Sequence, residues 1–447
     1  MAVWDGKGFK IKIQDISETI FRSELMEFEE DTRGRVAIGS ISDYEPQPLS
    51  FRLKFGQFAI AHVGKMNNLE ELVKSANKSG ALSTMSNDGV NPIEVVAQLI
   101  NSGKDIVDGI EIAQESISGS CSLMIASPDA IYLARDKFGR TPIFTAKRPG
   151  AYAASLETCA LFNRGFEDFQ GLLPGEIGRL SSRGYERLKP GDENSLQICA
   201  FLWVYYGNPA SSYEEKNVEL FRNRNGMNHA KRNLHEKDKI DFVAGIPDSG
   251  TGHGIGYAVG LGVPFFRPYV KYGQTWTRSF MPPSQEKRDH VAHMKLIPIP
   301  ELIKDKRILF TEDSIVRGTQ LRERTEALKQ YGVLEVHMRP SCPPLIYPCE
   351  FSNFSRSKGQ YALAGKRAIR DIEGTEDLNE KQIRAYAEED SPKYFQMVDK
   401  IRQSIRHLDS LDYQRLPLLV EATGLPKEKL CTHCWDGSSY CVGCPKK

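Results

Sequence analysis

The sequence predicts an α/β protein whose central part forms a doubly wound, mostly parallel sheet. Between about residues 196 and 350, short apolar strands alternate with helical patterns, and this alternation is typical of such a sheet. The predicted strands are 240–246, 263–266, 307–310 and 334–338, and the predicted helices are 255–261 and 320–331. Gly332 follows the second helix at once and is expected to end it.

The chain on either side of this region has a different pattern of apolar and turn residues. Residues 1 to about 190 contain short alternating segments between turn residues, which predict a β-rich α+β layer domain. Its clearest segments are the strands 35–39, 58–62 and 131–135 and the helices 69–79 and 92–102. A polar stretch, 181–194, is interpreted as the connection to the next domain, and amphipathic helices are expected at 376–389 and 393–408. We therefore expect domains at 1–190 and 191–425 and a Cys-rich tail at 426–447.

The composition indicates a small-molecule partner. With 59 basic and 58 acidic residues the formal net charge is +1, so nothing draws the whole chain to nucleic acid or to an anionic membrane. The first residues lack the apolar core of a signal peptide, and no run approaches the roughly twenty apolar residues of a membrane helix. We expect a soluble cytoplasmic protein, in which nine cysteines do not primarily form disulfides.

One segment, 308–319, combines an apolar strand, an acidic pair and a small-residue turn that opens a helix. Unpaired N–H groups and the helix dipole favour a phosphate at that turn. Glu312 and Asp313, at the carboxyl end of the strand, can accept hydrogen bonds from sugar hydroxyls. The pattern predicts a ribose-phosphate site, although spacing alone fits an ordinary capped helix equally well.

A second candidate loop, 245–256, also follows a strand and leads into a helix. Its five glycines let the backbone approach a ligand, and Ser249 and Thr251 add hydroxyl donors. It is not a P-loop, because no Gly-Lys-Ser/Thr follows, and by itself such a turn is more often only a turn.

The amino-acid sequence of 312–319 resembles the phosphoribosyl pyrophosphate (PRPP) signature of type I phosphoribosyltransferases, and specifically that of the glutamine PRPP amidotransferases of purine synthesis. That family usually has Asp-Asp where this chain has Glu312-Asp313. The resemblance implies that 245–256 holds the pyrophosphate, that a mobile basic loop closes over PRPP, and that Mg²⁺ stabilises the departing pyrophosphate. The implied catalytic residues are Glu312, Asp313, Lys271 and Arg278. The implied PRPP-binding residues are Asp248, Ser249, Gly250, Thr251, Gly252, Ser314, Ile315, Val316, Arg317, Gly318, Thr319, Arg288 and Lys295.

Residues 1–180 resemble the glutaminase half of the same family, which implies a degenerate Ntn-hydrolase-like αββα domain. The matching segments are 39–42, 47–49, 58–62, 135–142, 156–160 and 173–176. Such glutaminases use an N-terminal Cys, whereas this chain begins with Met1. Val63 stands where the family has an oxyanion-stabilising Asn, and Ser42 or Asp43 where it has an Arg for the glutamine carboxylate. We expect no glutamine hydrolysis, with ammonia supplied from solution or by a separate protein.

The cysteines near the end of the chain predict a metal site. By themselves the two Cys-x2-Cys pairs, 431/434 and 441/444, favour a zinc knuckle, although the spacer is short. The resemblance instead implies an iron-sulfur cluster (4Fe-4S) with a structural role, which some members of the family hold. Its ligands would be Cys199, Cys349, Cys431 and Cys434. Cys441 and Cys444 stay unassigned, while Cys121, Cys159 and Cys342 are interpreted as small buried hydrophobes.

The favoured function is therefore phosphoribosyl transfer from PRPP to ammonia, giving 5-phosphoribosylamine and pyrophosphate. Two alternatives remain: a PRPP-binding regulatory pseudoenzyme that pairs with an active amidotransferase, and a transferase for a different amine. The resemblance also suggests a homo-oligomer.

Overall fold

The fold was analysed in a computed structural model, which describes residues 1–14, 21–42, 45–78, 90–271, 296–352 and 363–438. The chain divides into two compact units. The first comprises 1–198 with 350–354, and the second comprises 199–349 with 355–447. Each unit is described by itself.

The first unit is built on a six-stranded antiparallel sheet in the order β12-β11-β7-β6-β5-β4. Its strands are β4 (Leu49–Leu53), β5 (Gly56–Met66), β6 (Gly119–Ala126), β7 (Ala130–Ala134), β11 (Ile177–Ser181) and β12 (Gly184–Lys189). Helices α3 (Pro92–Ser102) and α4 (Ile106–Ser116) pack on one face through a buried apolar cluster. Asn91 begins α3 by accepting a hydrogen bond from the N–H of Ile93, and Asp105 begins α4 in the same way.

A second, three-stranded sheet covers the opposite face. It has the order β2-β1-β3, with β1 (Ala2–Trp4), β2 (Phe9–Ile11) and β3 (Val36–Ile38). Small side chains such as Ala2, Ala59 and Ala126 fill the core between the sheets. A third sheet contains β8 (Phe144–Arg148), β9 (Ala151–Ser155) and β10 (Glu167–Gly171), and the other helices are α1 (Phe21–Asp31), α2 (Leu69–Lys78) and α5 (Thr158–Phe162). These layers confirm the predicted α+β class.

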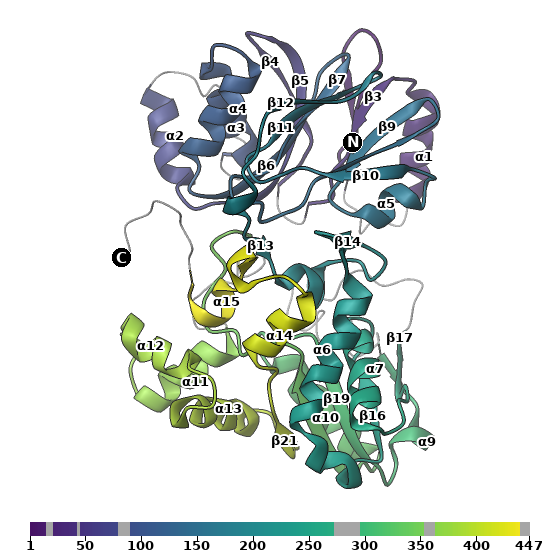
Figure 1. Cartoon of the computed structure of the whole chain (residues 1–447), viewed down its shortest axis with the longest axis vertical. Helices are drawn as coiled ribbons and strands as arrows, with labels where there is room; N and C mark the ends of the chain where they lie inside the picture. The colour runs from purple at the N-terminus through teal and green to yellow at the C-terminus, as the bar shows by residue number, and fades with distance from the viewer. Residues whose placement is uncertain (15–20, 43–44, 79–89, 272–295, 353–362, 439–447) are drawn as a thin grey trace. The chain divides into compact units, whose positions relative to one another are not determined.

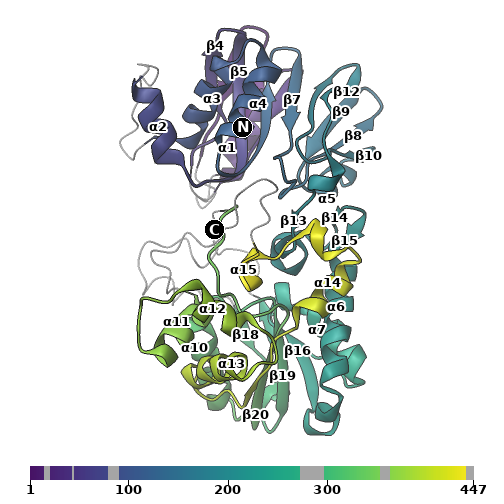
Figure 2. The ribbon, with the colours of Figure 1, turned by 60° about the vertical axis from the view of Figure 1, so that its left-hand side comes forward.

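The second unit contains a fully parallel sheet in the order β16-β19-β20-β21. Its strands are β16 (Phe242–Gly245), β19 (Arg307–Glu312), β20 (Glu335–Pro340) and β21 (Ser410–Leu411). Both faces are covered by helices, as Figures 1 and 2 show. α6 (Val218–Arg232) and α7 (Ser249–Leu261) pack on one side, and α10 (Thr319–Gln330), α11 (Ala364–Glu373) and α13 (Pro392–Ser404) on the other. The predicted doubly wound parallel sheet is therefore confirmed.

The remaining elements of the second unit are short. They are β13 (Ile198–Cys199, at the junction with the first unit), the π-helical turn η2 (Leu202–Tyr206), β14 (Ser212–Tyr213), β15 (Lys216–Asn217), β17 (Tyr269–Lys271), β18 (Leu296–Pro298), α9 (Pro300–Ile303), α12 (Glu380–Ala387), α14 (Leu416–Thr423), β22 (Leu430–Cys431) and α15 (His433–Asp436). Among the described residues, no helix is long and apolar enough to cross a membrane.

Three local predictions were wrong. The polar stretch 181–194 is no linker, because it contains the turn of the β11–β12 hairpin, and the chain passes into the second unit after Ile198. The predicted strand 263–266 makes only an isolated bridge, from Phe265 to Val243. The predicted loop over 249–254 is helical, since α7 begins at Ser249.

Candidate phosphoribosyl site

The acidic pair lies at the carboxyl edge of the parallel sheet. In register, Gly245 of β16 lies beside Thr311, and Glu312 lies beside Pro340 of β20. The N–H of Ile246 donates to the carbonyl of Thr311 at 2.9 Å, and the N–H of Ser341 to that of Glu312 at 2.8 Å. The ends of three neighbouring strands thus fix the backbone from which Glu312 and Asp313 project. Ligands of open α/β sheets bind outside this edge.

The environment of both carboxyl groups disfavours their ionisation. Burial, followed by the charge of Glu312, raises the pKa of Asp313 to about 8. Burial also raises the pKa of Glu312, whereas the guanidinium of Arg324, 3.6 Å away, favours its ionised form. The pair therefore holds protons more readily than free carboxyl groups do. A bound diol, by donating hydrogen bonds, or a cation would draw it towards the ionised state.

The bend after the pair offers unused hydrogen-bond donors. No backbone N–H of 315–319 donates to any group in the part of the chain that the structure describes. The carbonyls of the bend are held instead: Val316 accepts from the N–H of Ala364 at 2.7 Å, and Arg317 from Arg367 at 2.7 Å. Gly318, whose φ is +78°, directly precedes α10. These N–H groups therefore lie at the positive, N-terminal end of a twelve-residue helix. The arrangement suits an anion such as a phosphate.

The second candidate loop, 245–256, is built differently from the expectation. Only 246–248 lie between β16 and α7, and the N–H groups of Gly250 and Thr251 already donate to Ile246 at 2.9 Å and Asp248 at 3.1 Å. The glycines of α7 serve close packing on its neighbours: a Cβ on Gly250 would lie 2.4 Å from the carbonyl oxygen of Thr311 in β19, and one on Gly256 would lie 1.9 Å from the carbonyl oxygen of Asn223 in α6. These glycines therefore let α7 approach the neighbouring backbone, and they do not form a loop that approaches a ligand.

α7 nevertheless meets the acidic pair through one side chain. The Ser249 hydroxyl, at the start of α7, lies near Asp313 and favours its ionised form, and the Ser314 hydroxyl donates to Asp313 at 3.2 Å. Asp248 projects outward, to an ion pair with Lys271 at 2.6 Å. The structure thus unites Ser249 with the acidic pair and places Asp248 and Lys271 together at the rim.

Three predicted basic residues cannot be placed. Arg278, Arg288 and Lys295 lie in 272–295, outside the described residues, as do Cys441 and Cys444 near the end of the chain. The strands that flank 272–295 are described. β17 and β18 pair antiparallel, with Lys271 opposite Leu296, so the segment begins and ends at one place beside the sheet.

Sequence reasoning missed Arg222, a buried cation of α6. It donates from Nε to the carbonyl of Trp203 at 3.0 Å and from one terminal nitrogen to Tyr205 and Gly207 at 3.1 and 3.0 Å. Its charge also favours the ionised form of Asp313. A signal was present, because Arg222 falls on the helix face whose other members, such as Val218 and Phe221, are buried.

The four cysteines predicted as ligands converge in the second unit. The N–H of Ala200, next to Cys199, donates to the carbonyl of Cys431 at 3.2 Å. The N–H groups of residues 346 and 347, just before Cys349, both donate to the carbonyl of Cys434 at 3.1 Å. A hydrogen bond with the Cys349 thiol, then burial, raise the pKa of Cys434, and Cys199 and Cys431 are close enough to add to this effect.

These thiols do not form a closed single-ion site in their present positions. Over the described ranges, no three His, Cys, Asp or Glu side chains lie where they could hold one metal ion. The donor set, four thiols drawn from three separate segments, fits a soft metal centre in kind.

In the first unit, the glutaminase-like motif lies on β5. The ring nitrogens of His62 are buried with no partner among the described residues, and burial lowers the pKa of His62 to about 4. Val63 lies opposite Ser122 of β6 and Gly64 opposite Cys121. Gly64 has a φ of +133°, and a Cβ there would come 2.1 Å from the carbonyl oxygen of Ser120, so only glycine fits. Ser42 is described, whereas Asp43 is not.

Comparisons with known proteins agree with this arrangement. Residues 33–163 match the family model of the glutamine amidotransferase domain. An amidophosphoribosyltransferase of Methanothermobacter thermautotrophicus is 30% identical over 431 residues, covering 94% of this chain and 82% of the relative. One from Synechococcus elongatus is 28% identical over 460 residues, covering 100% of this chain and 85% of the relative.

Solved structures extend the likeness to both units. The structure of the glutamine PRPP amidotransferase from B. subtilis complexed with ADP and GMP matches with a TM-score of 0.77 and 25% identity, covering 98% of this chain and 90% of that one. A structure described as the allosteric regulatory enzyme of purine biosynthesis matches with a TM-score of 0.71 and 27% identity, covering 88% and 77%. This chain therefore belongs to the amidophosphoribosyltransferase family, a family of pentosyltransferases.

Proposed function

We propose that the chain transfers the phosphoribosyl group of PRPP to ammonia, forming 5-phosphoribosylamine and pyrophosphate. The observation that carries the proposal is the pairing of Glu312 and Asp313 with unused N–H donors at 315–319, one strand-to-helix turn apart. The spacing suits a ligand with a sugar diol next to a phosphate ester. The name of the B. subtilis relative supplies PRPP as the donor and an amide nitrogen as the group that accepts, and ammonia is our choice of acceptor for this chain.

The proposed reaction needs positioning more than covalent help from the protein. The nitrogen lone pair of ammonia attacks C1 of the ribose, the bond from C1 to the pyrophosphate oxygen breaks, and its electron pair leaves with pyrophosphate. The amine then loses a proton to solvent. Glu312 and Asp313 would hold the ribose hydroxyls, while the N–H groups of 315–319 would hold the 5′-phosphate. Mg²⁺ bound with PRPP would neutralise charge on the leaving group.

We further propose that the first unit does not hydrolyse glutamine. By the resemblance to the family's glutaminase half, Val63 stands where an oxyanion-stabilising Asn is expected, and its side chain has no hydrogen-bonding group. Burial keeps its neighbour His62 neutral. Losing one such donor costs roughly 10²–10³ in rate. Ammonia would then come from solution or from a separate protein.

The test measures pyrophosphate and glutamate together. Pure protein with PRPP and Mg²⁺ receives either ammonium or glutamine. The proposal expects pyrophosphate with ammonium and neither product with glutamine. PRPP binding without turnover would favour a regulatory pseudoenzyme, and turnover only with another amine would favour a different acceptor. Glutamate release from glutamine would refute the proposal that the first unit does not hydrolyse glutamine. As a control, Glu312→Gln should lose pyrophosphate formation but should not change any glutamate release.

We also propose that Cys199, Cys349, Cys431 and Cys434 hold an iron-sulfur cluster of the 4Fe-4S type. When bound it would tie 199, 349 and the 431–436 segment into one structural unit. Anaerobic purification should give iron and sulfide in equal amounts, with visible absorbance that Cys349→Ser removes and Cys159→Ser retains. Stoichiometric zinc without iron would overturn the assignment.

A further inference from the structure

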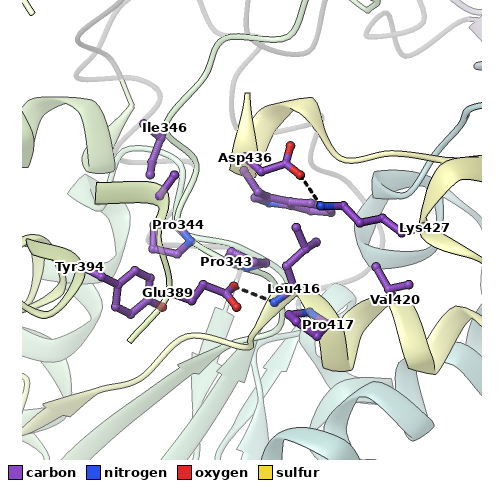
Figure 3. A pocket seen from close by; sticks show the side chains of 12 residues that line it. Pro343, Pro344, Ile346, Glu389, Tyr394, Leu416, Pro417, Val420, Lys427 and Asp436 are labelled. Carbon is purple, nitrogen blue, oxygen red and sulfur yellow. Dashed lines mark hydrogen bonds and ion pairs between the residues drawn. The ribbon is translucent and has the colours of Figure 1, made fainter. Parts of the chain in front are cut away.

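A cavity in the second unit has neither Glu312 nor Asp313 in its lining and has no part in the proposed reaction. It encloses about 470 Å³, within the roughly 300–1,000 Å³ typical of small-molecule sites. Figure 3 shows Pro343 and Pro344 on one side and Leu416, Pro417 and Val420 on another. Most of the wall is therefore apolar. Trp435, just after the Cys431/Cys434 pair, adds an aromatic surface.

Two of the three charged side chains that line the cavity form an ion pair with each other, and the third, Glu389, has no ion-pair partner among the described residues. Lys427 and Asp436 pair with each other at 2.9 Å, as the dashed line in Figure 3 shows, and so cancel. Glu389 accepts one hydrogen bond through Oε1, from the N–H of Leu416 at 2.7 Å. Among the described residues, Glu389 has no ion-pair partner, and no group donates to its Oε2. The lining thus carries one carboxyl group that has no ion-pair partner among the described residues.

The nearest buried cation does not supply the missing partner. Arg415 donates from Nε and a terminal nitrogen to Asp390 at 3.0 and 2.8 Å, and from the other terminal nitrogen to Asp412 at 3.2 Å. Two carboxylates therefore already share its charge. Burial raises the pKa of Glu389, which shows that its ionised form is poorly solvated where it stands.

These observations define the chemistry of an occupant. A flat apolar body would suit a lining that contains two prolines and the indole of Trp435, and a cationic group at its end could donate to Oε2 of Glu389. A phosphate or carboxylate would be repelled by the ionised Glu389. We propose that this cavity is a binding site for a small, flat organic cation, anchored by Glu389.

Benzamidine is a suitable probe, because it is flat and its amidinium can donate two hydrogen bonds to a carboxylate. Binding to the full-length protein would be titrated by ligand-observed NMR. Glu389→Gln, which keeps an acceptor for Leu416, should weaken binding about tenfold or more through loss of a charged hydrogen bond. Val420→Phe, which fills the cavity, should weaken it as much.

Matched controls separate this site from others. Glu380→Gln removes an exposed acid of α12 that pairs with Arg384 and should leave benzamidine binding within about twofold. Glu312→Gln should also leave it unchanged, which excludes capture by the phosphoribosyl site. Benzoate, the anion of similar shape, should not bind. Equal affinity of wild type and Glu389→Gln, equal binding of benzoate, or no binding of benzamidine up to about 10 mM would overturn the proposal.

Discussion

The substitution Gly250→Ala tests whether close packing of α7 on β19 positions the acidic pair. The new Cβ would lie 2.4 Å from the carbonyl oxygen of Thr311 and 3.2 Å from Cα of Glu312, whereas ordinary contact begins near 3.4 Å. Both neighbours are backbone, so they cannot rotate away. The start of α7 must move from β19 by about 1 Å, taking Ser249 away from Asp313.

The expected magnitude follows from two opposing effects. Overpacking costs about 1–3 kcal/mol, and the better helix propensity of Ala returns about 1 kcal/mol. With a rigid neighbour we expect a net loss of roughly 2 kcal/mol in the unfolding free energy of the second unit. Because a misplacement of about 1 Å can cost 10²-fold in rate, kcat/KM for PRPP should fall by about 10- to 100-fold.

Gly256→Ala provides the matched control. Its Cβ would lie 1.9 Å from the carbonyl oxygen of Asn223 in α6, on the other side of the same helix. It should destabilise at least as much in urea unfolding, yet lower kcat/KM far less. If both variants lose stability equally and Gly250→Ala keeps the wild-type kcat/KM, the positioning argument fails.

Three further predictions concern charge and capping. Because the pKa of Asp313 is raised in the folded state, the ligand-free protein should lose stability as pH rises from about 4 towards 8. Asp313→Asn should remove this loss and abolish transfer, and a variant whose urea unfolding keeps the wild-type pH profile would contradict the prediction. Arg339→Met removes a buried guanidinium and leaves the partly buried Glu236 without its cationic partner, which should cost about 3–5 kcal/mol in unfolding free energy. Arg402→Met, which breaks a more exposed pair, should cost under about 0.5 kcal/mol, and equal effects would refute the distinction. Asn91→Ala removes the cap of α3 and should cost about 1 kcal/mol, and a thermal melt that shows no loss would exclude the capping role.

The doubly wound sheet was predictable because its strands are buried on both faces and its helices keep a clear period. β19 and α10 lie within a residue or two of the predicted bounds. The start of α7 was not predictable in this way, since five glycines argue for a loop when helix propensity is considered alone. Tertiary packing reverses that preference, because only glycine allows α7 to approach both β19 and α6.

The candidate site could be proposed from the sequence where one segment carries its own chemistry, as 312–319 does. Contacts between distant segments were not. The reach of Ser249 to Asp313 and the charge of Arg222 depend on how α6 and α7 lie against the sheet. Likewise, the spacing of Cys431 and Cys434 indicated a metal site, whereas the gathering of Cys199 and Cys349 around them depends on backbone hydrogen bonds from remote parts of the chain.

A crystal structure of the protein with Mg²⁺ and PRPP would test the central claim most directly. We predict the 5′-phosphate on the N–H groups of 315–319 and the ribose hydroxyls on Glu312 and Asp313. PRPP bound elsewhere, or a bend whose N–H groups point away from the phosphate, would contradict the account.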